Sequence, residues 1–335
     1  MQAHEDLVPG ARVAGRLLSG ASLKGRDLRG IDAVDCELTG ADLSDAILME
    51  AALDRVSAVG VILKGAVLSR ARLRVATLTG ADLRGSDLSG ADLRRSVFTG
   101  ARFSLSSLAG ARLSLSVLDG AALDGADLRG ADLSRARLSG ANLSGANLTG
   151  ANLSEADLTE AKLTGAILNE AALPGARLVK ASLDGAALFR ADLSDCEFQD
   201  VTASSADFTR ATLRGARLIS MVAPHALFEF ADLGRAKLAR CDLNECSFRG
   251  AELEGCEAVK CTFRQADFLW SQFDSMKLAD CDTSEIRKPA KSVIQFAPRG
   301  AGVPAVAQRV LYRAPATTEG RTLLLRDAVE AGLLK

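Results

Sequence analysis

Leucine or phenylalanine recurs at every fifth position along most of this chain. Between residues 13 and 283 there are 55 such positions, and 48 of them hold Leu or Phe. Two residues before these positions the chain carries a small residue, Ala, Ser or Cys, in 47 of 55 cases. The register never slips, so an internal repeat of five residues determines the fold before any local propensity does.

A five-residue period fits neither an α-helix nor a flat strand. In a helix each five-residue step turns by about 140°, so the leucines would scatter around every face. In a flat strand side chains alternate, so successive leucines would point to opposite faces. The pattern therefore predicts a short extended piece and a bend in each repeat, with the leucine and the small residue before it facing a shared interior. Glycine, which is common at the last position, suits the bend.

A single repeat is too small to fold alone. Ordering five residues costs on the order of 5 to 10 kcal/mol of backbone entropy, whereas burying one leucine returns roughly 1.5 to 3 kcal/mol. The coils must therefore stack, so that the backbone groups of each coil pair with the coils above and below it.

The words ADLRG, ANLSG and ANLTG, which occur between residues 126 and 150, resemble those of the pentapeptide-repeat family. The resemblance extends over residues 11–285, about four fifths of the chain. It implies an all-β fold, a right-handed quadrilateral β-helix (solenoid) with four repeats in each coil and about 14 coils in total. Residues 20 apart in the sequence are then vertical neighbours.

We expect three parts: an N-terminal cap at 1–12, the solenoid at 13–285 and a non-repeat tail at 286–335. Arg16 and Arg26 replace the small inward residue, so the first coil is imperfect and the first residues are expected to lie across it. An open β-solenoid needs such a cover at its unpaired ends.

The tail differs sharply from the solenoid. It contains four prolines and carries 9 basic against 3 acidic residues, and residues 322–334, TLLLRDAVEAGLL, predict a short amphipathic helix capped by Thr322. We expect the tail to cap the last coil; homodimerisation through this end, which the family resemblance implies, is the alternative.

Composition places the chain among folded, soluble proteins. Of its 335 residues 48% are hydrophobic and 25% charged, and the formal net charge is -1, which is ample material for a large core. No basic segment followed by an apolar run opens the sequence, and no apolar stretch approaches the roughly 18 residues of a membrane span. We therefore expect a cytoplasmic protein that does not contact membranes.

The sequence offers little for catalysis. It has two histidines, His4 and His225, and neither belongs to a recognisable nucleophile or acid–base constellation. Every glycine-rich segment follows the repeat, so no phosphate-binding loop stands out. We expect no enzymatic activity, no cofactor and no metal site.

All seven cysteines occupy the small inward position that alanine otherwise fills. We interpret them as packing groups; a redox or metal role is the alternative. Phe208, Phe228, Phe248 and Phe268 are spaced by 20 residues and are expected to stack inside the solenoid. The cysteines are Cys36, Cys196, Cys241, Cys246, Cys256, Cys261 and Cys281.

Two kinds of outward position stand out as candidate contact surfaces. One face is rich in arginine and is expected to be basic, although acidic neighbours one coil away compensate part of its charge: Arg55, Arg70, Arg72, Arg74, Arg94, Arg95, Arg112 and Arg135. Apolar residues at outward positions form three small candidate patches for protein contacts: Ile47, Met49 and Val67; Val97, Leu115 and Val117; Ile219, Val222, Leu227 and Phe230.

Two binding functions remain. The first is a non-enzymatic, rigid scaffold that presents such patches to another protein. The second comes from the resemblance, because one branch of the family imitates duplex DNA and protects or inhibits DNA gyrase. The solenoid has 32 basic and 37 acidic residues between 11 and 285, a net charge of -5 that is weak for a DNA mimic. Direct nucleic-acid binding is not expected, given the near-neutral charge and scarce aromatic residues.

Overall fold

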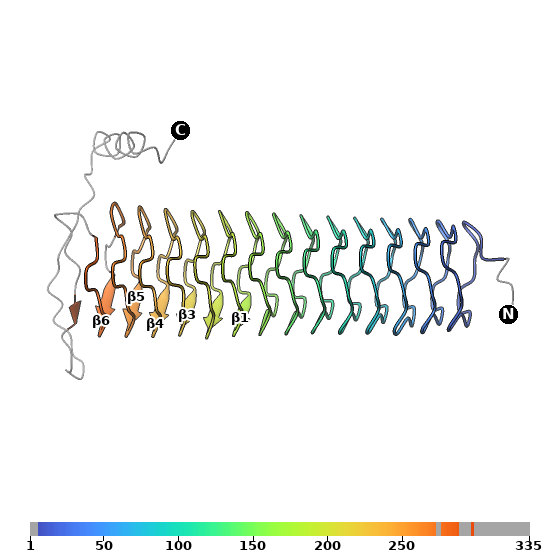
Figure 1. Cartoon of the computed structure of the whole chain (residues 1–335), viewed down its shortest axis with the longest axis horizontal. Coiled ribbons are helices and arrows are strands. Elements are labelled where there is room, and N and C mark those ends of the chain that lie inside the picture. The colour runs from blue at the N-terminus through green and yellow to red at the C-terminus, as the bar shows by residue number, and fades with distance from the viewer. Residues whose placement is uncertain (1–5, 273–275, 288–295, 298–335) are drawn as a thin grey trace, which may run out of the picture.

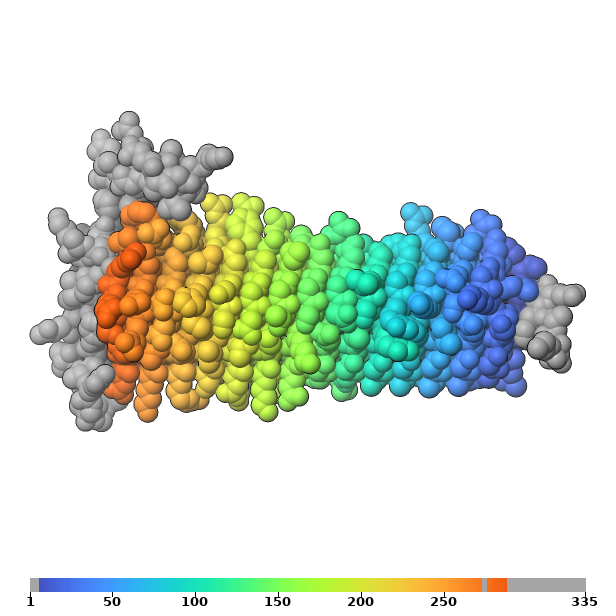
Figure 2. Space-filling view, in the orientation of Figure 1, coloured from blue at the N-terminus to red at the C-terminus, as the bar shows by residue number. Residues whose placement is uncertain are grey.

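The computed structural model describes residues 6–272, 276–287 and 296–297, and most of them form one rod of stacked coils (Figure 1). Parallel bridges join residues 20 apart, from Arg12 and Asp32 at the first coil to Asp267 and Arg287 at the last. Four repeats therefore make one coil, and the predicted all-β, quadrilateral β-helix is confirmed. Figure 2 shows the rod continuing without a break from the N-terminal coils to the C-terminal ones.

Seven short strands are long enough to be assigned, and they lie along one side of the C-terminal half of the rod. They form one parallel sheet in the order of the chain. The strands are β1 (Arg177–Val179), β2 (Glu197–Gln199), β3 (Arg217–Ile219), β4 (Lys237–Ala239), β5 (Glu257–Val259), β6 (Lys277–Ala279) and β7 (Phe296–Ala297). No helix occurs among the residues that the structure describes. The helix predicted at 322–334 lies outside them.

The interior is built from the two inward positions of each repeat. Leucines such as Leu133 and Leu143 and alanines such as Ala131 are fully buried. The predicted phenylalanine ladder is confirmed: ring centroids in the column of residues 208, 228, 248 and 268 are 4.7 to 5.0 Å apart, with interplanar angles of 0° to 5°. The core is therefore continuous along the described coils.

The cysteines line the same interior. Six are buried, Cys281 is half-buried, and none forms a disulfide. The thiols of Cys36, Cys196 and Cys246 each donate a hydrogen bond to a backbone carbonyl at 3.0 Å. Among the described residues no cluster of histidine, cysteine or carboxylate side chains could hold a metal ion. These contacts agree with a packing role.

The first coil meets residues that precede the repeat. Leu7 is buried at the end of the core, and its carbonyl oxygen accepts a hydrogen bond of 2.9 Å from the Arg26 guanidinium. The Arg16 guanidinium pairs with the carboxylate of Asp6. Both arginines that interrupt the small-residue column thus bind residues 6 and 7 at the N-terminal end of the solenoid.

Candidate interaction surface

In the coils between residues 35 and 155, one edge of the solenoid carries side chains where the other edges mostly carry glycine. The last residue of each repeat turns the backbone with a positive φ, and residues 20 apart fall on the same edge. Between 35 and 155 one edge has no glycine, and we call it the substituted edge. Its residues are Asp35, Arg55, Val75, Arg95, Leu115, Arg135 and Glu155.

The neighbouring edge makes the contrast plain. Over the same coils glycine fills all six of its positions, and each of the two remaining edges has glycine at four of six positions. The six glycines of the neighbouring edge are Gly40, Gly60, Gly80, Gly100, Gly120 and Gly140. The solenoid can therefore turn on glycine throughout this region, and the substituted edge departs from that rule in seven consecutive coils.

Side chains on this edge carry a conformational cost. Left-handed backbone brings Cβ close to the following carbonyl oxygen, at roughly 1 to 2 kcal/mol for each residue other than glycine. Val75, with a φ of 58°, is the only β-branched residue with a positive φ in the part of the chain that the structure describes, and this class tolerates the conformation least. A second edge, from Glu160 to Asp280, also lacks glycine in seven consecutive coils, but its side chains are all polar. Because strain of this kind concentrates at functional sites, and because this edge alone of the two adds the apolar Val75 and Leu115, the substituted edge is the leading candidate surface.

A groove of about 440 Å³ runs beside the edge. Its lining combines four guanidinium groups, two exposed apolar side chains, one carboxylate and one hydroxyl. Val75 is 55% exposed and Leu115 is 46% exposed. The lining residues are Asp54, Arg55, Arg74, Val75, Arg94, Arg95, Ser114 and Leu115.

The carboxylate of the groove lies beneath its arginines. The Asp54 side chain is only 5% exposed, whereas that of Arg74 is 45% exposed. Arg74 holds Asp54 with two side-chain hydrogen bonds of 3.0 and 2.8 Å and a backbone N–H bond of 3.0 Å, and Arg72 approaches within 3.3 Å. These hydrogen bonds, above all those from the Arg74 side chain, hold the pKa of Asp54 below its ordinary value. A partner therefore meets the guanidinium groups rather than the carboxylate.

The neighbouring acid follows the same arrangement. Arg94 donates hydrogen bonds of 2.7 and 2.6 Å to the carboxylate of Asp92, and Arg112 lies 3.8 Å from it. The Asp92 side chain is 15% exposed, while that of Arg112 is 53% exposed. Charges that balance in a formal count thus leave a cationic outer surface.

The arginines of the substituted edge differ in how they are paired. Arg55 binds Asp35 at 2.7 and 2.6 Å, and Arg135 binds Glu155 at 2.9 and 3.1 Å. Between them, Arg95 makes no ion pair with any described residue, and Arg70 on another edge makes none within the same part of the chain. Arg95 is therefore the central free cation, with Val75 and Leu115 one coil away on either side.

The family comparison agrees with this architecture. The model of the pentapeptide repeats matches in eight copies, at residues 17–55, 51–90, 76–114, 96–135, 116–154, 156–195, 181–218 and 226–274. The chain is a pentapeptide-repeat protein.

Solved structures include other members of the family. HetL, involved in heterocyst differentiation regulation in the cyanobacterium Nostoc sp. strain PCC 7120, is 32% identical over 70% of this pentapeptide-repeat protein and 90% of its own chain, with a TM-score of 0.25. Rfr23 from the cyanobacterium Cyanothece 51142 is 37% identical over 30% of this chain and 62% of its own, with a TM-score of 0.14. QnrB1, a plasmid-mediated fluoroquinolone resistance protein, is 21% identical over 57% of this chain and 89% of its own, with a TM-score of 0.31. No curated protein matches the chain.

Two of the three apolar patches predicted for this pentapeptide-repeat protein contain residues that pair across adjacent coils. Ile47 and Val67 are bridge partners, and Met49, two residues from the bridge, is 40% exposed. Val97 and Val117 are likewise bridge partners next to the substituted edge.

The third predicted patch occupies several sides of the coil. Val222 and Leu227 are exposed on two successive repeats and belong to different bridge columns. Ile219 ends strand β3. Phe230 turns onto the next coil, where its ring would lie 2.6 Å from a Cβ on Gly250. The structure therefore does not bring these four residues together on one face.

The sequence analysis did not predict Val75 as a candidate surface residue, nor the substituted edge to which it belongs. A search of the sequence for charged outward positions does not find it, because its side chain is small and apolar. Writing the sequence in rows of 20 residues would have shown two columns without glycine, from 35 to 155 and from 160 to 280, of which only the first contains apolar residues. The pattern therefore appears only when residues 20 apart are compared, and this comparison requires the number of residues in each coil.

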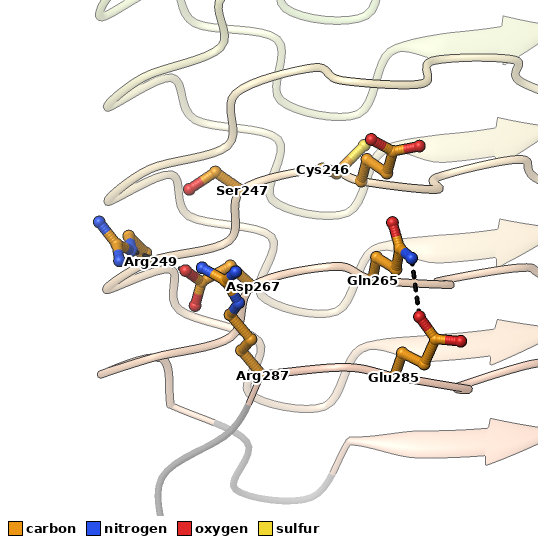
Figure 3. Close-up of a pocket in the computed structure, with 8 residues that line it drawn as sticks. Cys246, Ser247, Arg249, Gln265, Asp267, Glu285 and Arg287 are labelled. Carbon is orange, nitrogen blue, oxygen red and sulfur yellow. Dashed lines mark hydrogen bonds and ion pairs between the residues drawn. The ribbon is translucent and has the colours of Figure 1, made fainter.

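A second groove, of about 600 Å³, lies near the C-terminal end of the described coils (Figure 3). It is lined by Glu245, Cys246, Ser247, Arg249, Gln265, Asp267, Glu285 and Arg287. The Arg249 guanidinium binds the Asp267 carboxylate at 2.8 Å, and the Gln265 amide donates to Glu285 at 2.7 Å. The thiol of Cys246 is bound to the carbonyl of Ala223, so it offers no free nucleophile to this groove.

The part of the chain that the structure describes contains no helical membrane span.

Proposed function

We propose that this pentapeptide-repeat protein is a rigid scaffold that binds another protein through the substituted edge and the groove beside it. The observation that carries the proposal is that exposed apolar Val75 and Leu115 alternate with arginines on this edge, in left-handed backbone where glycine would be unstrained. Exposed apolar groups next to guanidinium groups are typical of protein-binding surfaces, in which arginine is enriched. We expect the cytoplasm to be the compartment in which it acts.

The stacked coils suit such a role. Each repeat is hydrogen-bonded to the coils above and below, so the surface is positioned before a partner arrives. A preorganised surface loses little conformational entropy on binding. The stacked coils would thus hold the surface in a fixed shape, and the side chains of the substituted edge would contact the partner.

Capture from an extract of the source organism tests this proposal. The full-length chain, the triple variant V75G/R95G/L115G and the control R235G are immobilised, and bound proteins are quantified by mass spectrometry. Arg235 lies on the same column outside the substituted edge and also has a positive φ, so the control changes the backbone in the same way. We expect at least one protein to be retained by the wild type and by R235G and lost from the triple variant. Identical retention by all three chains would refute the proposal.

The gyrase hypothesis requires a continuous acidic stripe along the rod. On the column that pairs Arg72, Asp92, Arg112 and Asp132 the sign alternates from coil to coil, and the groove is cationic at its surface. These features favour the scaffold over DNA mimicry. A gyrase supercoiling assay separates the two, since the scaffold predicts no effect at micromolar concentrations of the protein, and inhibition or protection of gyrase would favour mimicry.

A further inference from the structure

The substituted edge alternates between charged and apolar side chains at a regular spacing. Arg55, Val75, Arg95, Leu115 and Arg135 follow one another on consecutive coils, and their backbone N–H groups each donate to the adjoining coil at 2.8 to 3.1 Å. Parallel rungs are about 4.8 Å apart. Guanidinium groups therefore recur about every 9.6 Å, with an apolar side chain halfway between them.

An α-helix matches this spacing. Along a helix, residues i, i+3, i+7, i+10 and i+14 rise by about 0, 4.5, 10.5, 15 and 21 Å and share one face. The five edge positions lie at about 0, 4.8, 9.6, 14.4 and 19.2 Å. The two series stay within about 2 Å of each other over the whole edge.

Other occupants fit less well. In an extended strand, side chains on one face are about 6.7 Å apart, so they lose register with the coils by the second rung. The phosphates of a nucleic acid would match the arginines but would place Val75 and Leu115 against charged groups, which desolvates the phosphates without compensation.

We propose that the substituted edge binds an acidic amphipathic α-helix of a partner protein, with carboxylates at Arg55, Arg95 and Arg135 and apolar side chains at Val75 and Leu115. The inference rests on the proposed scaffold function and specifies its partner. Arg95 is the anchor, because its guanidinium has no acidic partner among the described residues. Asp35 and Glu155, already bound to the outer arginines, mark the two ends of the surface.

A designed peptide tests the inference with the full-length protein. The probe is a fluorescent helix of three heptads with Glu at the first and Leu at the fourth position of each heptad, and Ala or Gln elsewhere. Binding is measured by fluorescence anisotropy. We expect R95G to bind about tenfold more weakly than the wild type or more, R235G to bind like the wild type, and the affinity to fall with added salt. Glycine suits the backbone at both positions, so neither variant is expected to misfold.

Two control peptides and a DNA duplex complete the experiment. One peptide has the same composition with Glu and Leu dispersed around the helix, and the other carries central prolines that break the helix. Weaker binding of both supports the inference. Equal binding of either control, no loss with R95G, absence of any peptide binding, or R95G-sensitive binding of the duplex in preference to the peptide would overturn it. Because extract capture uses no designed peptide, it can still succeed when the helix inference fails.

Discussion

The composition of the repeat is explained by hydrogen bonds within each word. An Asp or Asn at the second position accepts the backbone N–H of the fourth residue, and often its hydroxyl as well, as between Asn152 and Ser154 at 3.0 and 2.6 Å. Where arginine stands at the fourth position, as in Arg84 beside Asp82, the same carboxylate accepts its guanidinium at 2.8 and 2.6 Å. These local bonds fix the turn that follows the leucine.

Glycine substitutions separate backbone strain from crowding at the turn. Gly80 has a φ of 66° and open space around its Cβ position, whereas Phe230 covers Gly250 at 2.6 Å. We expect G80A to destabilise the solenoid by about 1 kcal/mol through its backbone alone, and G250A to destabilise it further because the ring must move. Urea unfolding followed by circular dichroism measures both, and equal midpoints for the two variants would contradict the crowding described here.

The buried thiols make stability depend on pH. Burial raises the pKa of Cys196, Cys246 and Cys256 to about 12, so the folded chain keeps protons that the unfolded chain releases above its ordinary thiol pKa. Their contribution is complete below about pH 8.5 and is lost as the pH rises toward 12. The variant C196A/C246A/C256A, which restores the usual alanine, should lose stability less steeply between these limits. Parallel unfolding curves for the two chains would contradict this expectation.

At the scale of the coil, stability comes from identical neighbours stacked in register. The phenylalanine column shows this most clearly, since Phe228 lies between two parallel rings whose centroids are 4.8 and 5.0 Å away. Such a stack needs rings at the same place in successive coils, and the 20-residue spacing provides it. The coil, rather than the single repeat, is therefore the unit of packing.

Removing one ring of the column should be costly. We expect F228A to destabilise the protein by about 3 to 5 kcal/mol, because a fully buried ring is replaced by a cavity. Phe189, which is only half-buried at a turn, provides the matched control, and F189A should have a much smaller effect. Thermal and urea unfolding of both variants check the difference. Similar losses of stability in F228A and F189A would show that the phenylalanine column does not stabilise the solenoid more than a half-buried ring does.

The sequence was sufficient to predict which residues face inward and stack in columns, but not which charged residues form ion pairs. The burial of Leu133, Cys196 and Phe228 follows directly from the five-residue register, because side chains at the leucine position and at the small-residue position of the repeat both face inward. Ion pairs do not follow, because residues two apart and residues 18 or 20 apart compete for the same carboxylate. Asp92, for example, has Arg72 and Arg112 as column neighbours, yet its shortest contact, 2.6 Å, is to Arg94.

At the scale of the whole molecule, a stable rod gives up some stability at turns that carry side chains in place of glycine, and the substituted edge is one series of them. The described solenoid has a continuous core, so it can accommodate seven strained positions in succession on this edge, as it does again from Glu160 to Asp280. The same side chains are those proposed to contact the partner. Stability and binding should therefore respond in opposite directions to glycine on this edge.

The most direct test of this account is the stability of the triple variant V75G/R95G/L115G. Each glycine relieves left-handed strain at an exposed turn, so the account predicts that the urea midpoint rises, by the equivalent of about 1 kcal/mol or more in total. R235G should show a smaller gain of the same sign. An unchanged or lower midpoint of the triple variant would mean that the edge side chains stabilise the solenoid themselves, and it would contradict the claim that they are kept for binding.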